Sequence, residues 1–340
     1  MVADISQPNF SDFREDQHGG HVAQVNTLDW NCTGDCLGTG SADPSLLLYK
    51  LHPNGLIQTS SLANDKVPYS KKLPGVAHSN FFLIWHPSDP DRLVSLDEEG
   101  IRFWDTRSAK ITTSLPVAKK LLYAVWTPNG NEVVVTTSSN VNMIVDVRKE
   151  AIAKILSNSV EVNQAAISPD GRSVLQGLGN GHIAVCDYPS FQNRISLAGH
   201  MERVLSCKFD PSGRHDQAPP HSPLVSSMYF LSGSHDSTVT VWDFDTLMPV
   251  KNHYNYDSAI NDASFSHDSQ YLALGGDEYT IKINHTVTGE LAHKITCSGL
   301  PLALSWNPKH MLLGFSGESF PPDRENKSGM ANVNVFAPKL

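Results

Sequence analysis

Short runs of alternating apolar and polar residues, separated by turn residues, recur along the whole chain. The run "LSGSHDSTVTVWDFDT" at residues 231–246 is representative, because β-branched and polar residues alternate in it up to Trp242. This period-two alternation predicts a strand, and the Ser-His-Asp-Ser sequence ahead of it predicts a tight turn. With the apolar run at 228–231, the segment is predicted to form a β-hairpin, which needs neighbouring strands to be stable.

An aromatic or aliphatic residue followed by a turn sequence recurs seven times, and we call these residues anchors. They are Trp30, Trp85, Trp126, Ile167, Phe209, Phe265 and Trp306. The intervals between them are 55, 41, 41, 42, 56 and 41 residues, and the shorter intervals match the four-stranded blade of a WD-repeat propeller. Two surface segments explain the longer intervals, a Pro/Ser/His-rich insertion at 215–229 and an extended connection at 51–75. The sequence therefore predicts an all-β chain in which residues 1–340 form a single seven-bladed propeller.

The seventh repeat supplies three strands before the sequence ends, the third of them within residues 330–337. We expect an N-terminal strand at about residues 4–15 to pair with residues 330–337 and to complete the seventh blade. A ring closed in this way exposes few free strand edges, which an open sheet would offer to aggregation.

Composition and charge narrow the class of protein. The chain has a net charge of −9 and five cysteines, an odd number, which argues against a disulfide framework and for a reducing compartment. There is no basic start with an apolar core at the N-terminus and no apolar run of roughly 20 residues, so neither a secretory signal nor a membrane span is expected. An acidic chain gains little from phosphate contacts, and unaided binding to nucleic acid is therefore disfavoured.

Motifs that would indicate catalysis or a cofactor are weak. The "GLGNG" sequence at 177–181 would suit a nucleotide loop if a helix followed, but "HIAVCDY" predicts a strand, which favours a hairpin turn. His18 with His21, or Cys32 with Cys36, lack the matching second pair that a structural metal site needs. We expect no catalytic residue, no cofactor and no metal, and hence no enzyme activity.

The fifth repeat resembles the full signature of the WD-repeat family, through Gly199-His200, Ser232, Asp236 and Trp242-Asp243. The resemblance implies a buried hydrogen-bonded chain of His200, Ser232, Asp236 and Trp242. An indole N–H needs an acceptor, a hydroxyl relays the bond, and an imidazole links the hydroxyl to a carboxylate. The other repeats are degenerate. Residues that remain of the signature are His21 and Asp43 in the first, His78 and Trp104-Asp105 in the second, and Asp277 in the sixth.

Longer segments resemble the family of the third subunit of the THO complex. They lie at 85–95, 177–191, 209–213, 260–283 and 302–315. The resemblance implies a non-catalytic subunit in the nucleus, within a TREX assembly that couples transcription to mRNA processing and export. Its implied partners are large helical scaffold subunits and, through the assembly, a DEAD-box RNA helicase, with RNA contacted at most indirectly. Another WD-repeat adaptor, such as a ubiquitin-ligase substrate receptor or a chromatin-associated propeller, is the alternative.

Propellers usually bind partners at the rim where the first strands of the blades begin. Positions six and four residues before an anchor, and the position before the turn aspartate, are predicted to lie there. The candidates are Ser79, Phe81, Lys120, Leu122, Arg203, Leu205, His235, Leu300 and Leu302. An aromatic residue, an arginine and several leucines on one rim would form a mixed patch suited to a protein partner. The alternative is that the leucines line the central channel.

Overall fold

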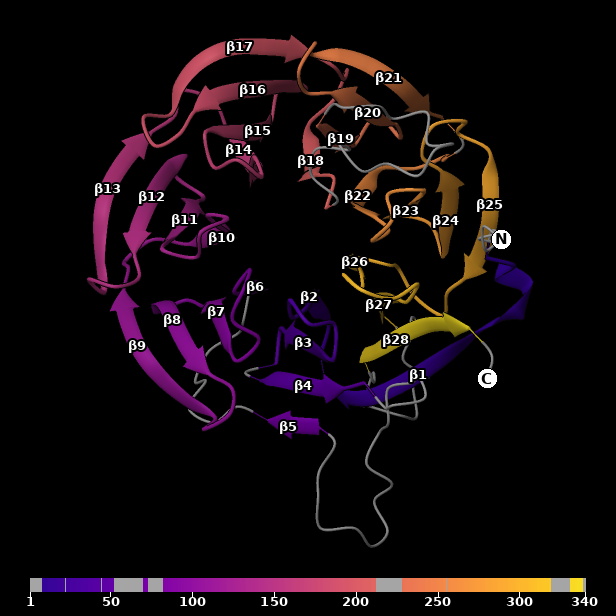
Figure 1. Cartoon of the computed structure of the whole chain (residues 1–340), viewed down its shortest axis with the longest axis horizontal. Coiled ribbons are helices and arrows are strands. Elements are labelled where there is room, and N and C mark those ends of the chain that lie inside the picture. Colours follow the sequence, from indigo (N-terminus) through magenta and orange to yellow (C-terminus); the bar gives the residue numbers. More distant parts are fainter. Residues whose placement is uncertain are drawn as a thin grey trace, which may run out of the picture.

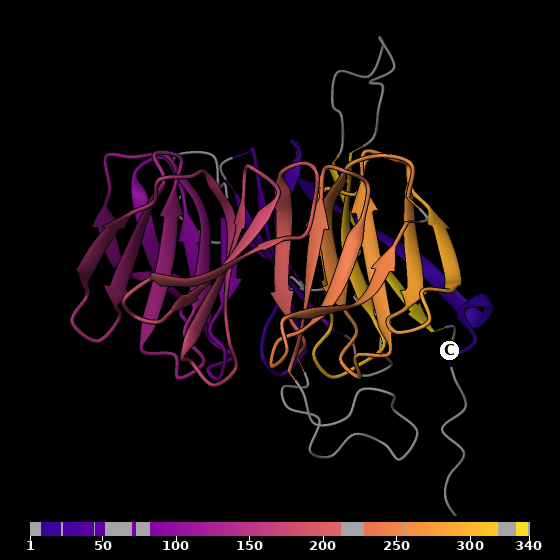
Figure 2. The same cartoon turned by 90° about the horizontal axis from the view of Figure 1, so that it is seen from above.

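Seven four-stranded antiparallel sheets are arranged as blades around a central axis (Figure 1). The computed structural model describes residues 8–21, 23–43, 45–51, 70–72, 82–211, 228–254, 256–318 and 331–338. Viewed from the side, the ring is a disc whose strands run between two opposite faces (Figure 2). The predicted all-β, seven-bladed propeller is confirmed. No helix in the described part of the chain is long and apolar enough to cross a bilayer.

Each of the first six blades is built from four consecutive strands, which follow one another from the axis outward. Blade one comprises β2 (Val25–Trp30), β3 (Cys36–Ser41), β4 (Leu46–Lys50) and β5 (Ser70–Lys72). Blade two comprises β6 (Phe82–Trp85), β7 (Arg92–Leu96), β8 (Gly100–Asp105) and β9 (Lys110–Pro116). Blade three comprises β10 (Leu121–Trp126), β11 (Glu132–Thr137), β12 (Val141–Asp146) and β13 (Ala151–Ser157). Blade four comprises β14 (Val162–Ile167), β15 (Ser173–Leu178), β16 (His182–Asp187) and β17 (Gln192–Ala198). Blade five comprises β18 (Val204–Phe209), β19 (Tyr229–Ser234), β20 (Val239–Asp243) and β21 (Met248–His253). Blade six comprises β22 (Ile260–Phe265), β23 (Tyr271–Gly276), β24 (Thr280–His285) and β25 (Leu291–Thr296).

Every anchor is the last residue of the first strand of its blade. The turns that follow have the expected chemistry. Gly130 follows Trp126 and Gly171 follows Ile167, with φ angles of 68° and 70°, a left-handed conformation that glycine adopts without steric cost. Segment 231–246 contributes the second and third strands of blade five, as its pattern predicts.

The hydrophobic core is divided among the interfaces between adjacent blades. The described residues form seven apolar clusters, and each joins the facing sides of two neighbouring blades. Between blades two and three, for example, Phe103 packs with Trp126 and Met143. Because each blade is covered on both sides, its second and third strands are buried along their length, as in β11 and β12.

The seventh blade is closed by the N-terminal segment. It contains β26 (Leu304–Trp306), β27 (Leu313–Glu318) and β28 (Ala331–Pro338), and β1 (Phe13–His21) pairs antiparallel with β28 as its outermost strand. Figure 1 shows β1, in indigo, beside β28, in yellow.

The predicted closing strand is correct in its role and wrong in its bounds, because β1 starts at Phe13 and the range 4–15 was expected. Phe10 starts a 3₁₀ helix, η1 (Phe10–Asp12), and its ring stacks on Phe336 and meets Tyr271 edge-on. This buried aromatic residue covers the end of blade seven, and the pairing with β28 begins after it.

The two predicted surface segments lie mostly outside the described residues. Of the connection at 51–75, the structure describes residue 51 and β5, which forms the outer strand of blade one. Of the insertion at 215–229, it describes residues 228 and 229, and Tyr229 already belongs to β19.

Candidate protein-binding surface

A buried hydrogen-bonded chain runs through blade five. Trp242 Nε1 donates to Ser232 Oγ at 2.8 Å, and Ser232 Oγ lies 2.7 Å from His200 Nε2. His200 Nδ1 lies 3.2 Å from Asp236 Oδ2. The structure thus brings together the four residues that the WD-repeat signature singles out. The His200 side chain is fully buried, and this desolvation lowers its pKa despite the nearby carboxylate of Asp236.

This chain fixes two loops on the face where the first strands begin. His200 lies in the connection between β17 and β18, whereas Asp236 lies in the turn between β19 and β20. The Asp236 carboxylate also accepts a hydrogen bond from the backbone N–H of Met201 at 2.9 Å. The backbone N–H of His235 donates to the Arg203 carbonyl at 3.0 Å. The buried chain therefore positions the two exposed side chains of His235 and Arg203 next to each other.

Blade one holds a second version of the chain, which the sequence revealed in part. His21 Nε2 lies 2.8 Å from Thr39 Oγ1, and His21 Nδ1 lies 3.3 Å from Asp43 Oδ2. Ser45 Oγ also contacts His21 Nδ1, at 3.0 Å. Tyr49 takes the position that Trp242 has in blade five, since it pairs with Leu37 as Trp242 pairs with Phe230. Thr39, Ser45 and Tyr49 were missed because the signature was sought as Trp-Asp.

The remaining blades depart further from this arrangement. In blade two, Trp104 Nε1 donates to Ser95 Oγ at 2.9 Å, while the predicted His78 lies outside the described residues. In blade six, Asp277 is exposed and accepts a hydrogen bond from Asn261 at 2.7 Å. Between blades five and six, the buried polar residues include His253 at the end of β21, which the sequence analysis missed. Its Nε2 lies 3.2 Å from the carbonyl of Thr286.

The first strands share a β-bulge at the position four residues before the anchor. The register shifts there in blades one, three, four, five and six, at Asn26, Leu122, Asn163, Leu205 and Asn261. A bulge leaves one residue outside the ladder and redirects its side chain. These five residues are half-buried at the start of their strands. The bulges explain why this position reaches the rim, and the three asparagines are rim residues that the sequence analysis missed.

The predicted rim residues that the structure describes belong to three blades that are not adjacent in the ring. Arg203, Leu205 and His235 belong to blade five, Lys120 and Leu122 to blade three, and Leu300 and Leu302 precede β26 of blade seven. Lys120, Arg203 and His235 are exposed, while the four leucines are half-buried. Ser79 and Phe81 lie outside the described residues. Asparagines at the bulges of blades one, four and six separate the groups.

Charged side chains also meet between neighbouring first strands. Lys208 Nζ lies 2.6 Å from Asp262 Oδ1, and the Leu304 N–H donates to Asp262 Oδ2 at 2.9 Å. Asp29 accepts a hydrogen bond from the Trp85 N–H at 3.0 Å. Burial raises the pKa of the Asp29 carboxyl to about 6, against the effect of this hydrogen bond and of Lys208. Because both carboxylates are engaged between blades, this cluster cross-links the first strands.

Four of the five cysteines are buried, as are both histidines of the candidate metal pair, His18 and His21. Burial raises the pKa of all five cysteine thiols, that of Cys207 to about 12, which disfavours the thiolate. His21 belongs to the buried chain of blade one, and His18 lies beside Tyr49. No group of three or more metal-ligating side chains occurs in the part of the chain that the structure describes.

Comparison with known proteins agrees with this geometry. The family described as "WD domain, G-beta repeat" matches residues 15–50, 191–243 and 246–283. The first two segments contain the residues of the two histidine chains.

Similar proteins extend the match over most of the chain. THO complex subunit 3 of Arabidopsis thaliana is 26% identical over 328 residues, covering 96% of this chain and 97% of that protein. WD repeat-containing protein AAC3 of Dictyostelium discoideum is 25% identical over 93% of this chain and 66% of its own length. The B-type cell cycle switch protein ccs52B of Medicago truncatula is 26% identical over 47% of this chain and 32% of its own length.

Proposed function

The chain is a WD40-repeat protein, and from this premise we propose that it is a non-catalytic scaffold subunit of a nuclear THO/TREX-type assembly that couples transcription to mRNA processing and export. The observation that carries the proposal is the end-to-end similarity to THO complex subunit 3, which covers 96% of this chain and 97% of that protein. A match confined to single repeats would indicate the fold without indicating a partner. Proteins of the WD40 propeller family typically lack catalytic activity.

We propose that large helical scaffold subunits bind the rim, and that a DEAD-box RNA helicase is reached through the assembly. The exposed Arg203 and His235 beside the half-buried Leu205 offer charge, hydrogen bonding and apolar contact at one place. A net charge of −9 favours docking on protein, with RNA contacted at most indirectly.

Affinity purification of the tagged full-length chain from nuclear extract, with identification of the co-purifying subunits, tests the proposal. We expect the large helical subunits of a THO-type complex among them. Purification with ubiquitin-ligase or chromatin components in their place would overturn the assignment and favour another WD-repeat adaptor.

A rim variant tests the surface separately. Arg203→Glu combined with Leu205→Ser should reduce recovery of the scaffold subunits while the melting temperature stays nearly unchanged. Arg172→Glu is the matched control, because this exposed arginine lies between β14 and β15, on the opposite face. Equal recovery with both variants would exclude the blade-five part of the rim as the interface.

A further inference from the structure

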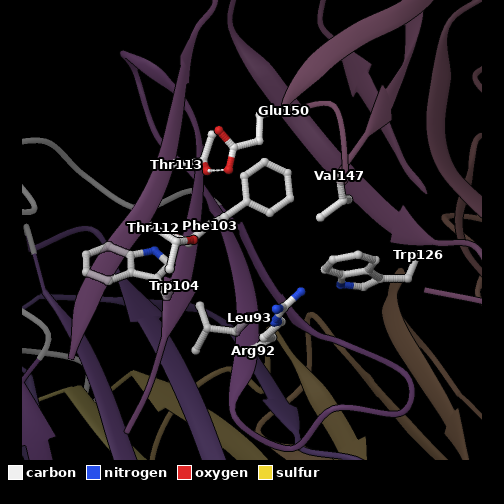
Figure 3. A pocket seen from close by; sticks show the side chains of 9 residues that line it. All are labelled: Arg92, Leu93, Phe103, Trp104, Thr112, Thr113, Trp126, Val147 and Glu150. Carbon is white, nitrogen blue, oxygen red and sulfur yellow. Dashed lines mark hydrogen bonds between the residues drawn. The ribbon is translucent and has the colours of Figure 1, made fainter. Parts of the chain in front are cut away.

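A pocket of about 120 Å³ lies between blades two and three. Its walls include Leu93, Phe103, Val147 and the indole of Trp126 (Figure 3). Arg92 starts β7 and Trp126 ends β10, so the pocket is near the face opposite the rim. A cavity of this size with apolar walls accommodates about one large side chain.

The indole N–H of Trp126 has no acceptor within the described residues. Trp126 is 7% exposed, and its Nε1 is buried without a hydrogen-bond partner. A buried donor without an acceptor has lost the hydrogen bond that it makes with water in the unfolded chain, so it is rare in folded proteins. Trp126 lines the pocket while its Nε1 is closed off from solvent, so the indole must shift slightly for this donor to meet a bound molecule.

Two of the three other anchor tryptophans close this bond with a carbonyl of the preceding blade, whereas the N–H of Trp306, like that of Trp126, has no acceptor among the described residues. Trp30 Nε1 donates to the Ser305 carbonyl at 3.1 Å, and Trp85 Nε1 donates to the Asp29 carbonyl at 2.9 Å. In each case the acceptor is the residue just before the anchor of the preceding blade. At Trp126, the imidazole of His86 packs edge-on against the indole, with 4.6 Å between ring centroids. His86 is itself fixed, because its Nε2 lies 3.1 Å from the Gly130 carbonyl.

A second donor lines the same space. Figure 3 shows the guanidinium of Arg92 and the indole of Trp126 along one side of the pocket, with Glu150 on the other. Arg92 Nε is 3.2 Å from Asp89, and its side chain is 61% exposed, which leaves guanidinium N–H groups available to a ligand. Glu150 already accepts a hydrogen bond from Thr113 at 2.7 Å. The side of the pocket formed by Arg92 and Trp126 therefore offers donors, and a carboxylate is the acceptor that suits two converging donors.

We propose that this pocket binds a peptide segment of a partner protein in which a large apolar side chain is next to an acidic residue. The apolar side chain occupies the space between Phe103, Leu93 and Val147. The carboxylate accepts hydrogen bonds from Trp126 Nε1 and from the guanidinium of Arg92, on the side away from Glu150. This site is distinct from the rim and does not depend on the identity of the proposed assembly.

The proposal is tested by NMR, which follows the indole N–H resonances of the full-length, ¹⁵N-labelled chain. The chain has six tryptophans, and the resonance that disappears in Trp126→Phe is that of Trp126. The probes are N-acetyl-Leu-Asp-amide and its neutral counterpart, N-acetyl-Leu-Asn-amide. We expect a saturable shift of the Trp126 resonance with the acidic peptide and about tenfold weaker binding of the neutral one. Trp306 Nε1 is also buried without a partner but does not line this pocket, so its resonance should stay in place.

Three variants complete the experiment. Arg92→Gln should weaken the acidic peptide about tenfold, and Val147→Phe should abolish binding by filling the pocket. Arg148→Gln removes an exposed charge beside the pocket without altering its lining, and it should bind as the unmodified chain does. The proposal is overturned if the Trp126 resonance does not move, if both peptides bind equally, or if Val147→Phe leaves binding intact.

Discussion

Asp236 accepts hydrogen bonds from four groups: His200 Nδ1, the Met201 N–H, and both the N–H and the hydroxyl of Thr238. Burial alone would raise the pKa of its carboxyl. The hydrogen bonds from Thr238 and Met201, with His200, hold that pKa below its usual value. A single carboxylate thus organises the loop before β18 and the turn before β20.

Asp236→Ala should lower the free energy of unfolding by about 1–3 kcal/mol, because it leaves His200 Nδ1 and the backbone N–H groups of Met201 and Thr238 without this acceptor. Asp277→Ala is the matched control, since the turn aspartate of blade six is exposed and bonds to Asn261 outside any histidine chain. Its cost should stay within about 0.5 kcal/mol. Urea unfolding midpoints of the two variants make the comparison, and equal midpoints would contradict a stabilising role for the chain.

His253 gives the protein a dependence on pH. Burial lowers the pKa of its imidazole to about 4, while an unfolded histidine titrates near 6.5. Between these values the unfolded chain binds a proton that the folded chain does not. Stability should therefore fall as the pH falls from about 6.5 to about 4, by roughly 3 kcal/mol from this group. In His253→Gln the free energy of unfolding should decline less over that window, and an unchanged slope would show that other groups cause it.

At the scale of single elements, the hairpin turns set the register of each blade. Gly171 and Gly181 both have a positive φ, of 70° and 83°, but their surroundings differ. A Cβ on Gly171 would meet no atom closer than Pro128 Cδ at 3.8 Å, whereas a Cβ on Gly181 would lie 2.4 Å from the carbonyl oxygen of His200. The second turn is thus packed against the loop that carries the buried chain of blade five.

Gly171→Ala should cost about 1 kcal/mol from backbone strain alone. Gly181→Ala should cost roughly 3 kcal/mol or more, because the backbone around His200 must also move. Thermal unfolding of the two variants, followed by circular dichroism, measures the difference. If both lose the same stability, the turn at Gly181 adjusts freely and its packing on blade five is weak.

The sequence could predict an element where that element has a distinct pattern of apolar and turn residues. The seven anchors were located because a buried apolar residue followed by a turn marks the end of every first strand. The position of β1 was missed because this strand buries two of its nine residues, His18 and His21, and shows almost no apolar alternation. The free donor of Trp126 could not be predicted, since it depends on whether a carbonyl of the neighbouring blade lies within reach.

At the scale of the whole molecule, the hydrophobic core of the described residues consists of apolar clusters between adjacent blades, arranged in a ring, and no single cluster joins all the blades. Each apolar cluster needs two blades, so blade seven must be complete to cover its neighbours on both sides. β1 contributes the outer strand of that blade, and Phe10 packs with Phe336 in the cluster shared with blade six.

Deleting residues 1–21 should lower the melting temperature and cause aggregation, because β28 would become an exposed edge strand. Deleting residues 1–7 removes none of the described contacts and serves as the control. Size-exclusion chromatography with light scattering, together with thermal unfolding, distinguishes the outcomes. A monomeric 1–21 deletion that melts like the full chain would mean that β1 does not close the ring in solution.

The pairing of β1 with β28 also has a consequence for synthesis on the ribosome. Phe13 is translated well before its partner Pro338, because the first six blades lie between them in the sequence. At about 5–20 residues per second, β1 waits roughly 15 to 60 seconds for its partner strand. Blades one to six acquire all their strands in the order of translation, whereas the seventh combines a strand made before blade one with strands made after blade six. The nascent chain therefore stays an open arc until β28 has been made, and this is the interval in which a chaperone would have to shield it.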